Sequence, residues 1–220
     1  MRGLQVPRNV YIAVVGSDLL RINTGEFVVL EDNLRVPSGV SYMLTNRRVM
    51  KRTFPQLFSS YGVRPIEHYP RCCCPRCARS RLRAVPSRTS CSSPPASSTP
   101  PTLSTPILPA KWASISLKAA TWLRTDNIVY MRTTDGLKRV DVIYRRVDDD
   151  FSDPLIFRTD SALGCAGLFN AYRAGNVTMA NAFGSGLADD KAVYAYVPKM
   201  IRYYLNEDPH PAQRRNIFAL

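Results

Sequence analysis

Two oxygen-bearing side chains, Glu31 and Asn33, lie at the end of an apolar segment near the start of the chain. If that segment is a β-strand, its period of two places both side chains on one face and Asp32 on the other. Carboxylate and amide oxygens are hard ligands of the kind that bind Mg²⁺. Polar residues also end ordinary strands, and from these residues alone the ordinary strand end is the favoured interpretation. Asp32 is expected to be structural.

Two arginines leave the end of a second predicted strand, where α/β proteins commonly bind ligands. Arg145 or Arg146 could hold a carboxylate through two parallel hydrogen bonds. The acidic run at residues 148–150 follows directly. It is equally consistent with a surface loop held by salt bridges, so both interpretations stay open.

A Pro-Ser-Gly turn follows the first polar pair. The backbone N–H groups of Ser38 and Gly39 could face an anion, although the same tripeptide is common in ordinary turns. Arg35 lies between Asn33 and this turn. It could pair with a carboxylate or phosphate, or it could be a surface arginine.

Alternating strands and helices would position these residues. We predict a β-hairpin over residues 9–32, with strands at 9–15 and 27–30 and its turn at Asn23-Thr24-Gly25. We then predict helical segments over 41–61 interrupted near Pro55, strands at 127–132 and 139–144, a helix at 162–172, a strand at 177–183 and a helix at 190–205. This alternation favours the α/β class.

Residues 71–124 differ in composition from both flanks. They contain no Asp or Glu, yet they hold nine of the thirty Lys and Arg residues and five of the six Cys. The net charge of +13 is therefore largely local. One interpretation is a disordered Pro/Ser/Arg linker. The other, which we favour, is a stretch translated out of frame.

Codon structure supports the second interpretation. Trp has the single codon TGG and Ala codons begin with GC, so Trp112-Ala113 read one base earlier gives Met or Val followed by Gly. The shifted frame permits VVLLTPG and NSAYFEHSYLARQMGIDLVEGRDL, a strand, a glycine turn, a helix and a strand. With the opposite shift, residues 210–220 permit ILPNVETYL.

The composition also bears on nucleic-acid-binding, zinc-binding and membrane proteins. A pI of about 9.8 and the arginines of residues 71–88 are compatible with a nucleic-acid-binding or interaction protein, but no aromatic residue lies between those arginines. A zinc site at Cys72, Cys73, Cys74, Cys77 and His68 is disfavoured because Cys91 stands alone. No apolar run or signal peptide directs the chain to a membrane, so we expect no membrane partner and a cytoplasmic protein.

Three long segments resemble the circularly permuted type 2 ATP-grasp proteins. They are VVLEDNLRVPSGVSYMLTNRRVM, VDVIYRRVDDDFSDPLIFRTDSALG and AYRAGNVTMANAFGSGLADDKAVYAYVPKMIRYYL. The resemblance covers residues 4–70 and 125–209, and glutathionylspermidine synthase is more distantly similar. It implies an ATP-grasp-like partial fold, with hairpin and helices in 1–70 and an α/β segment in 125–209. Residues 71–124 would disrupt a pre-ATP-grasp-like segment, and 210–220 would be an out-of-frame tail.

The resemblance also implies a reaction and a set of residues. ATP would phosphorylate a carboxylate and an amine would then form an amide, with Mg²⁺ bridging phosphate oxygens. In the related ligases an Asp on one strand and a Glu-x-Asn on the next hold the metal, which here implies Asp18, Glu31 and Asn33. Lys191 resembles a lysine that contacts ATP phosphates, although a solvated lysine behind an Asp helix cap is the alternative.

The chain also departs from the family pattern. The Lys-Glu strand and the Gly-rich loop over the nucleotide do not appear in it. We therefore expect an interior fragment with two frame breaks that is inactive as written.

Overall fold

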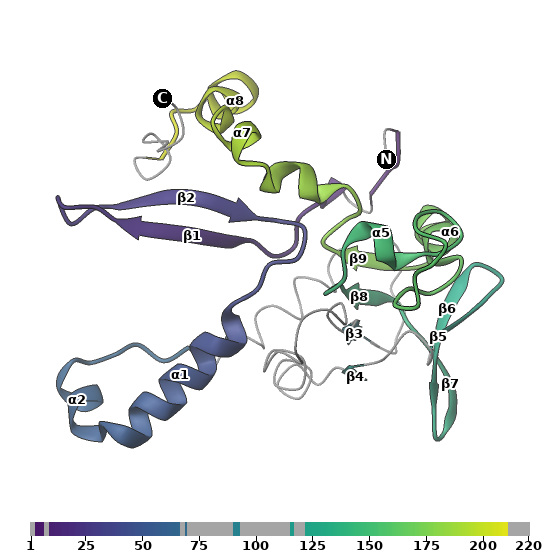
Figure 1. Ribbon diagram of the computed structural model, residues 1–220, viewed down its shortest axis with the longest axis horizontal. Helices are drawn as coiled ribbons and strands as arrows, with labels where there is room; N and C mark the ends of the chain where they lie inside the picture. Colours follow the sequence, from purple (N-terminus) through teal and green to yellow (C-terminus); the bar gives the residue numbers. More distant parts are fainter. Residues whose placement is uncertain are drawn as a thin grey trace.

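The computed structural model of this chain describes residues 3–6, 9–66, 69 and 126–210, together with the backbone of three short strands between them. The elements are small sheets flanked by helices, as the predicted α/β class requires (Figure 1). The frame-shift predictions for 71–124 and 210–220 fall mostly outside the described residues. They stay predictions.

An antiparallel hairpin forms the N-terminal sheet. It comprises β1 (Gly16–Arg21) and β2 (Phe27–Asn33). At the turn the Ile22 N–H donates to the Glu26 carbonyl at 2.9 Å, and Gly25 has a φ of 85° that glycine adopts without strain. The predicted hairpin is confirmed, except that the strand over residues 9–15 is wrong. Those residues instead make backbone contacts with the segment that follows β9, described below.

Two helices follow the hairpin, α1 (Val40–Thr53) and α2 (Pro55–Ser60). The predicted interruption at Pro55 is confirmed, since α1 ends at Thr53 and α2 begins at Pro55. Proline lacks an N–H and is tolerated in the first turn of a helix but not in its interior. Figure 1 shows both helices (blue) extending away from the hairpin and from the sheets of the C-terminal half.

The central sheet is parallel, with strand order β4-β3-β8-β9. Its strands are β3 (Ser90–Ser92), β4 (Ile115–Ser116), β8 (Val142–Tyr144) and β9 (Thr178–Ala180). A three-stranded antiparallel sheet lies beside it, with β5 (Trp122–Thr125), β6 (Ile128–Thr133) and β7 (Gly136–Arg139). The prediction of one strand over 139–144 is wrong. The chain leaves β7 at Arg139, the Val140 N–H donates to the carbonyl of Val129 in β6, and the chain enters the parallel sheet at Val142.

Short helices complete the C-terminal half: α5 (Asp149–Ser152), α6 (Leu168–Arg173), the 3-10 helix η3 (Ser185–Asp189), α7 (Lys191–Tyr194) and α8 (Val197–Leu205). The predicted helix at 162–172 begins only at Leu168. Gly164 has no room for a Cβ because the carbonyls of Phe151 and Ser152 lie against it. The predicted helix at 190–205 is two helices, and Pro198 lies in the first turn of the second.

The main core lies between β6, β8, β9 and α6. Val129, Met131, Ile143 and Ala171 are almost completely buried. Around Phe183, the rings of Phe157, Phe169 and Tyr172 lie 5.1 to 5.8 Å away between centroids. Among the described residues no helix is both long and apolar enough to cross a membrane.

Candidate active site at the end of the hairpin

The segment Leu34–Pro37 joins the end of β2 to the start of α1 and is held by side chains from the other end of the chain. The Leu34 carbonyl accepts hydrogen bonds from Asn181 Nδ2 at 2.5 Å and Ser185 Oγ at 3.3 Å. The Pro37 carbonyl accepts from Tyr144 Oη at 3.3 Å and Arg146 Nη1 at 2.6 Å. The Leu34 N–H donates to Asp189 Oδ1 at 2.6 Å. Leu34–Pro37 is therefore fixed against the ends of β8 and β9, and the residues on either side of it are positioned with it.

The three predicted metal ligands lie at one end of the hairpin. In the strand register Asp18 is directly opposite Glu31, and Asn33 is opposite Gly16. Residues directly opposite each other point to the same face, so all three lie on one face. On the other face Ser17 Oγ donates to Asp32 Oδ1 at 2.5 Å. Asp18 therefore lies across the ladder from Glu31, and Asp32 accepts a hydrogen bond on the opposite face.

Lys191 reaches this end of the hairpin from α7. Its Nζ lies 3.4 Å from Glu31 Oε2. Asp190 caps the helix by accepting from Ala192 N at 2.8 Å, so the predicted cap is present as well. Helix α7 lies against β2. One turn further on, burial and the neighbouring charge of Asp32 raise the pKa of Tyr194 to about 12.

Arg35 extends from Leu34–Pro37 toward η3. A Cβ added to Gly186 would overlap the guanidinium of Arg35. Within the described part of the chain, Arg35 Nε is buried and has no hydrogen-bond partner. The backbone N–H of Arg35 donates to both oxygens of Asp189 at 3.2 Å. Arg35 is therefore anchored through its backbone while its side chain retains an unused donor.

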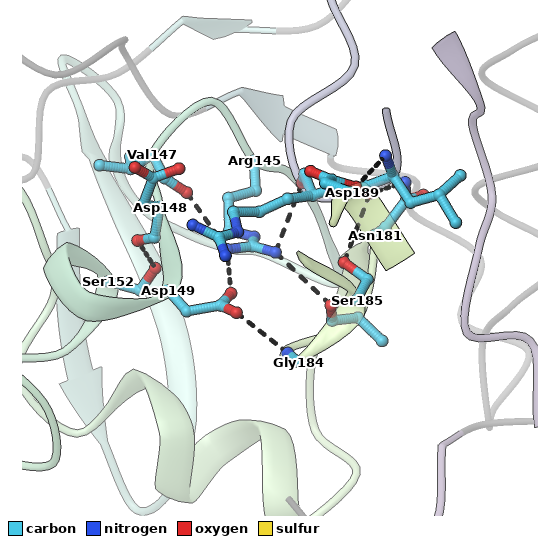
Figure 2. A network of polar contacts seen from close by, with 12 residues as sticks. Arg145, Val147, Asp148, Asp149, Ser152, Asn181, Gly184, Ser185 and Asp189 are labelled. Atoms are coloured by element: carbon cyan, nitrogen blue, oxygen red, sulfur yellow. Dashed lines mark hydrogen bonds and ion pairs between the residues drawn. The ribbon is translucent and has the colours of Figure 1, made fainter. Parts of the chain in front are cut away.

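Arg145 is buried, with 1% of its surface exposed. Its guanidinium forms an ion pair with Asp149 and donates to the carbonyl of Val147 (Figure 2). It also donates to the carbonyl of Ala182 and lies 5.3 Å from the Phe183 ring centre. Burial lowers the pKa of Arg145 from its usual value, and Asp149 opposes this effect. With these donors directed at protein acceptors, Arg145 is placed to organise the strand end rather than to contact a ligand.

Arg146 points the other way, toward the turn at the start of α1. It borders a small pocket together with Ser38 and Gly39, and the pocket contains about 310 Å³ of empty space including its open side. The structure thus brings the predicted anion-binding turn and one of the two predicted carboxylate-binding arginines to the same place. Sequence reasoning had treated these features separately.

Several residues that position the site were missed. Asn181 Oδ1 accepts from the N–H groups of Ala13 and Val14 while its Nδ2 donates to Leu34 O. Asp149 joins Arg145 to the Gly184 N–H at 3.0 Å. The available signal for Asn181 was one amide within the apolar run VTMANAF, because a buried polar side chain must find partners.

The donor set can be compared with the needs of a metal ion. The described residues contain no group of three or more His, Cys, Asp and Glu side chains suited to a metal. The hairpin end offers two carboxylates and an amide, all hard oxygen donors that suit Mg²⁺ and do not suit softer metals. The residues therefore fit a magnesium ion that takes its remaining ligands from water and phosphate.

Comparison with known proteins gives a consistent family. A family model described as "A circularly permuted ATPgrasp" matches residues 1–214. An uncharacterised protein of Mycobacterium tuberculosis (strain ATCC 25618 / H37Rv) is 48% identical over 217 residues, covering 94% of this chain and 38% of that protein. An uncharacterised protein of Synechocystis (strain PCC 6803) is 44% identical over 218 residues, covering 94% and 43%.

A third relative, from Frankia alni, is named "Putative glutamate--cysteine ligase 2-3". It is 38% identical over 204 residues, covering 90% of this chain and 23% of that protein. The chain spans about two fifths of the length of the mycobacterial and Synechocystis relatives. The match over residues 1–214 shows that this chain belongs to the circularly permuted ATP-grasp family.

Proposed function

We propose that this chain supplies the metal-binding end and part of the substrate surface of an ATP-dependent carboxylate–amine ligase. Family membership supports ATP chemistry. The name of the Frankia alni relative, and that of a Frankia casuarinae protein named "Putative glutamate--cysteine ligase 2-2", support joining a carboxylate to an amine. Because the chain spans only part of its relatives, the complete reaction is proposed for the whole protein.

One observation carries the proposal most directly. Asp18 and Glu31 are paired across the hairpin, and Lys191 approaches Glu31 from a helix near the other end of the described chain. Two carboxylates next to a lysine could bind a divalent cation and a polyphosphate together. The cation is attracted to the carboxylates, and the ammonium is attracted to phosphate oxygens.

The oxygen donors of Asp18, Glu31 and Asn33 would hold Mg²⁺ on the shared face of the hairpin. With ATP and Mg²⁺ bound, a substrate carboxylate oxygen attacks the γ-phosphorus and ADP leaves, and an amine then displaces phosphate from the acyl phosphate and loses a proton. The hairpin would present these three side chains to the metal without rearrangement, because the strand register aligns them on one face. Such preorganisation lowers the cost of binding.

The cationic residues divide into three roles in this proposal. Lys191 and Arg35 would face phosphate oxygens, since both lie at the end of β2 and Arg35 has an unused donor. Arg146, with Ser38 and Gly39, would face the substrate. Arg145 would act by positioning Asp149 and the strand end, because both terminal nitrogens of its guanidinium already contact protein atoms.

The proposal can be tested on this chain with Mn²⁺ as a paramagnetic substitute for Mg²⁺. Binding would be followed by water-proton relaxation for the unaltered chain, for Glu31→Gln and for Glu26→Gln. Glu26 is a matched control because it lies in the same hairpin at the turn, where Thr24 Oγ1 donates to it at 3.3 Å. Loss of one carboxylate ligand should weaken Mn²⁺ binding by about tenfold or more in Glu31→Gln.

The control variant Glu26→Gln should bind Mn²⁺ as the unaltered chain does. Equal binding by both variants would show that the hairpin end does not hold the metal. Titration with ATP in the presence of Mg²⁺ then measures whether nucleotide binding depends on the same carboxylate.

A further inference from the structure

The small pocket at the start of α1 has the features of a built anion site. One wall is the segment Pro37–Ser41, which includes the turn and the first residues of the helix. Tyr144 and Arg146 form another wall, and Val14 closes an apolar side. The pocket is small and part of its empty space is open solvent, so it suits a single small chemical group such as a carboxylate rather than a nucleotide.

Ser41 provides the observation that points to a ligand. It is completely buried and borders the pocket, yet its Oγ has no hydrogen-bond partner in the part of the chain that the structure describes. A buried hydroxyl without a partner is unfavourable. A ligand atom that accepts this hydrogen bond would remove that penalty, so an occupant with acceptor oxygens is favoured.

The local charges favour a negatively charged occupant. Helix α1 is 14 residues long, has no side-chain cap and has no acidic residue in its first turn. Its first intrahelical bond runs from Met43 N to Gly39 O, so the N–H groups before Met43 have no intrahelical acceptor. These donors and the helix dipole attract an anion. Arg146 adds a full positive charge on the opposite wall.

We propose that this pocket binds the carboxylate group of a small acid, with Ser41 and the first N–H groups of α1 as hydrogen-bond donors. The apolar wall, which includes Val14, Val15 and Val40, would contact the aliphatic part of the acid. Inorganic phosphate presents similar oxygens but has no apolar part. Identification of this acid as a ligase substrate rests on the function proposed above, whereas the anion site itself does not.

The position of the pocket agrees with such a role. Ser38 follows Asn33 by five residues, and an extended chain of that length spans at most about 18 Å. An acid in the pocket therefore lies within reach of a polyphosphate held at the end of the hairpin.

The site can be tested by recording amide NMR spectra of the full chain during titration with acetate, 3-methylbutanoate and inorganic phosphate at constant ionic strength. We expect the amide signals of Ser38–Met43 to shift, with 3-methylbutanoate binding more tightly than acetate or phosphate. Tighter binding of phosphate, or no shift with any of the three, would overturn the proposal.

Two serine and threonine variants separate a ligand contact from a structural role. Ser41→Ala should weaken 3-methylbutanoate binding by about tenfold, the usual effect of losing a hydrogen bond to a charged group. Thr45→Ala is the matched control. Thr45 lies one helical turn after Ser41, and its Oγ1 is also buried without a partner among the described residues. Thr45 does not line the pocket. Equal weakening by both variants would contradict the proposal.

Thermal unfolding without ligand provides a second measurement. Because the Ser41 hydroxyl has no partner among the residues that the structure describes, Ser41→Ala should unfold at the same or a higher temperature. A lower temperature would show that Ser41 has a structural partner and would overturn the proposal. No metal or nucleotide is present in these experiments, so their outcome is independent of whether the hairpin binds Mn²⁺ and ATP.

Discussion

Lys191 Nζ lies 3.4 Å from Glu31 Oε2, which joins the start of α7 to the end of β2. Both residues were singled out in the sequence, Glu31 as a metal ligand and Lys191 as a phosphate contact, but for separate reasons. Their proximity predicts that the ammonium ion competes with a metal for Glu31 and neutralises a polyphosphate when one binds. These two effects have opposite signs and can be measured separately.

Replacing Lys191 by Gln should therefore tighten Mn²⁺ binding and weaken ATP binding. Repulsion between Lys191 and the metal disappears in the first case, and attraction to phosphate disappears in the second. Because Lys191 is more than half exposed, the free energy of unfolding should change by less than about 1 kcal/mol. Relaxation measurements with Mn²⁺ and calorimetric titration with ATP provide the two readouts.

Lys199→Gln is the control for this experiment, since Lys199 lies in α8 with its Nζ 5.7 Å from the Tyr196 ring centre. It should alter neither affinity. If Lys191→Gln weakens Mn²⁺ and ATP binding together, the lysine organises the site instead of competing with the metal.

Buried Arg145 forms an ion pair with Asp149, whose side chain is 17% exposed, and removal of the arginine should be destabilising. Arg145→Met leaves the Asp149 carboxylate without its cation, which should cost about 3 kcal/mol, the lower end of the range for a buried pair. Arg146→Met removes a half-buried arginine that donates to the backbone carbonyls of Val36 and Pro37, and it should cost less. Urea unfolding of both variants measures the difference, and equal losses would contradict this assignment.

The sequence predicted the hairpin and its polar end well because both depend on local signals. The turn at Asn23-Thr24-Gly25, the period of two and the Glu-x-Asn spacing are contained in about twenty residues, and the register matches them. The role of Arg145 was harder to foresee. Whether an arginine at a strand end faces a ligand or the core depends on Asp149, Ala182 and Phe183, which no local pattern brings together.

The predicted boundaries of strands and helices were wrong where tertiary contacts override local preference. Residues 9–15 are β-branched and apolar, yet they form no strand because the Asn181 side chain takes the N–H groups of Ala13 and Val14. Gly164, pressed against backbone carbonyls, delays the start of α6. Such contacts between distant segments override propensity.

Asn181 should therefore be one of the more sensitive polar residues of the fold. Its amide contacts backbone atoms of Ala13, Val14 and Leu34. Asn181→Leu would leave these groups unsatisfied and should cost about 2 to 4 kcal/mol. Asn176→Leu is the matched comparison, because its Nδ2 donates only to an exposed carbonyl, that of Asn127. A similar loss in both variants, measured by urea unfolding, would show that Asn181 does not hold these segments together.

Tyr172 should make the fold sensitive to alkaline pH. Burial raises the pKa of its phenol to about 12, so the folded state holds the proton more tightly than the unfolded chain, whose pKa is about 10. This contribution to stability is complete below about pH 10 and is lost as the pH rises toward 12. When the pH rises from about 9 to about 11, the urea midpoint of unfolding should fall less in Tyr172→Phe than in the unaltered chain. An equal fall of the midpoint in both proteins would contradict the raised pKa of Tyr172.

Gly186 offers a way to move Arg35 without altering any charge. A methyl group at Gly186 would overlap the guanidinium of Arg35, which is the flexible end of a side chain. In Gly186→Ala the guanidinium should therefore swing away while the Asp189 contacts to the backbone of Leu34 and Arg35 remain. If Arg35 faces phosphate, this variant should weaken ATP binding about as much as Arg35→Gln, with little change in Mn²⁺ binding. Gly62→Ala tests the effect of a methyl group elsewhere, since nothing lies within 4 Å of its added Cβ, although its φ of 56° makes the substitution strained. Weakened ATP binding in Arg35→Gln but not in Gly186→Ala would mean that Arg35 reaches the nucleotide from a different position than the one seen here.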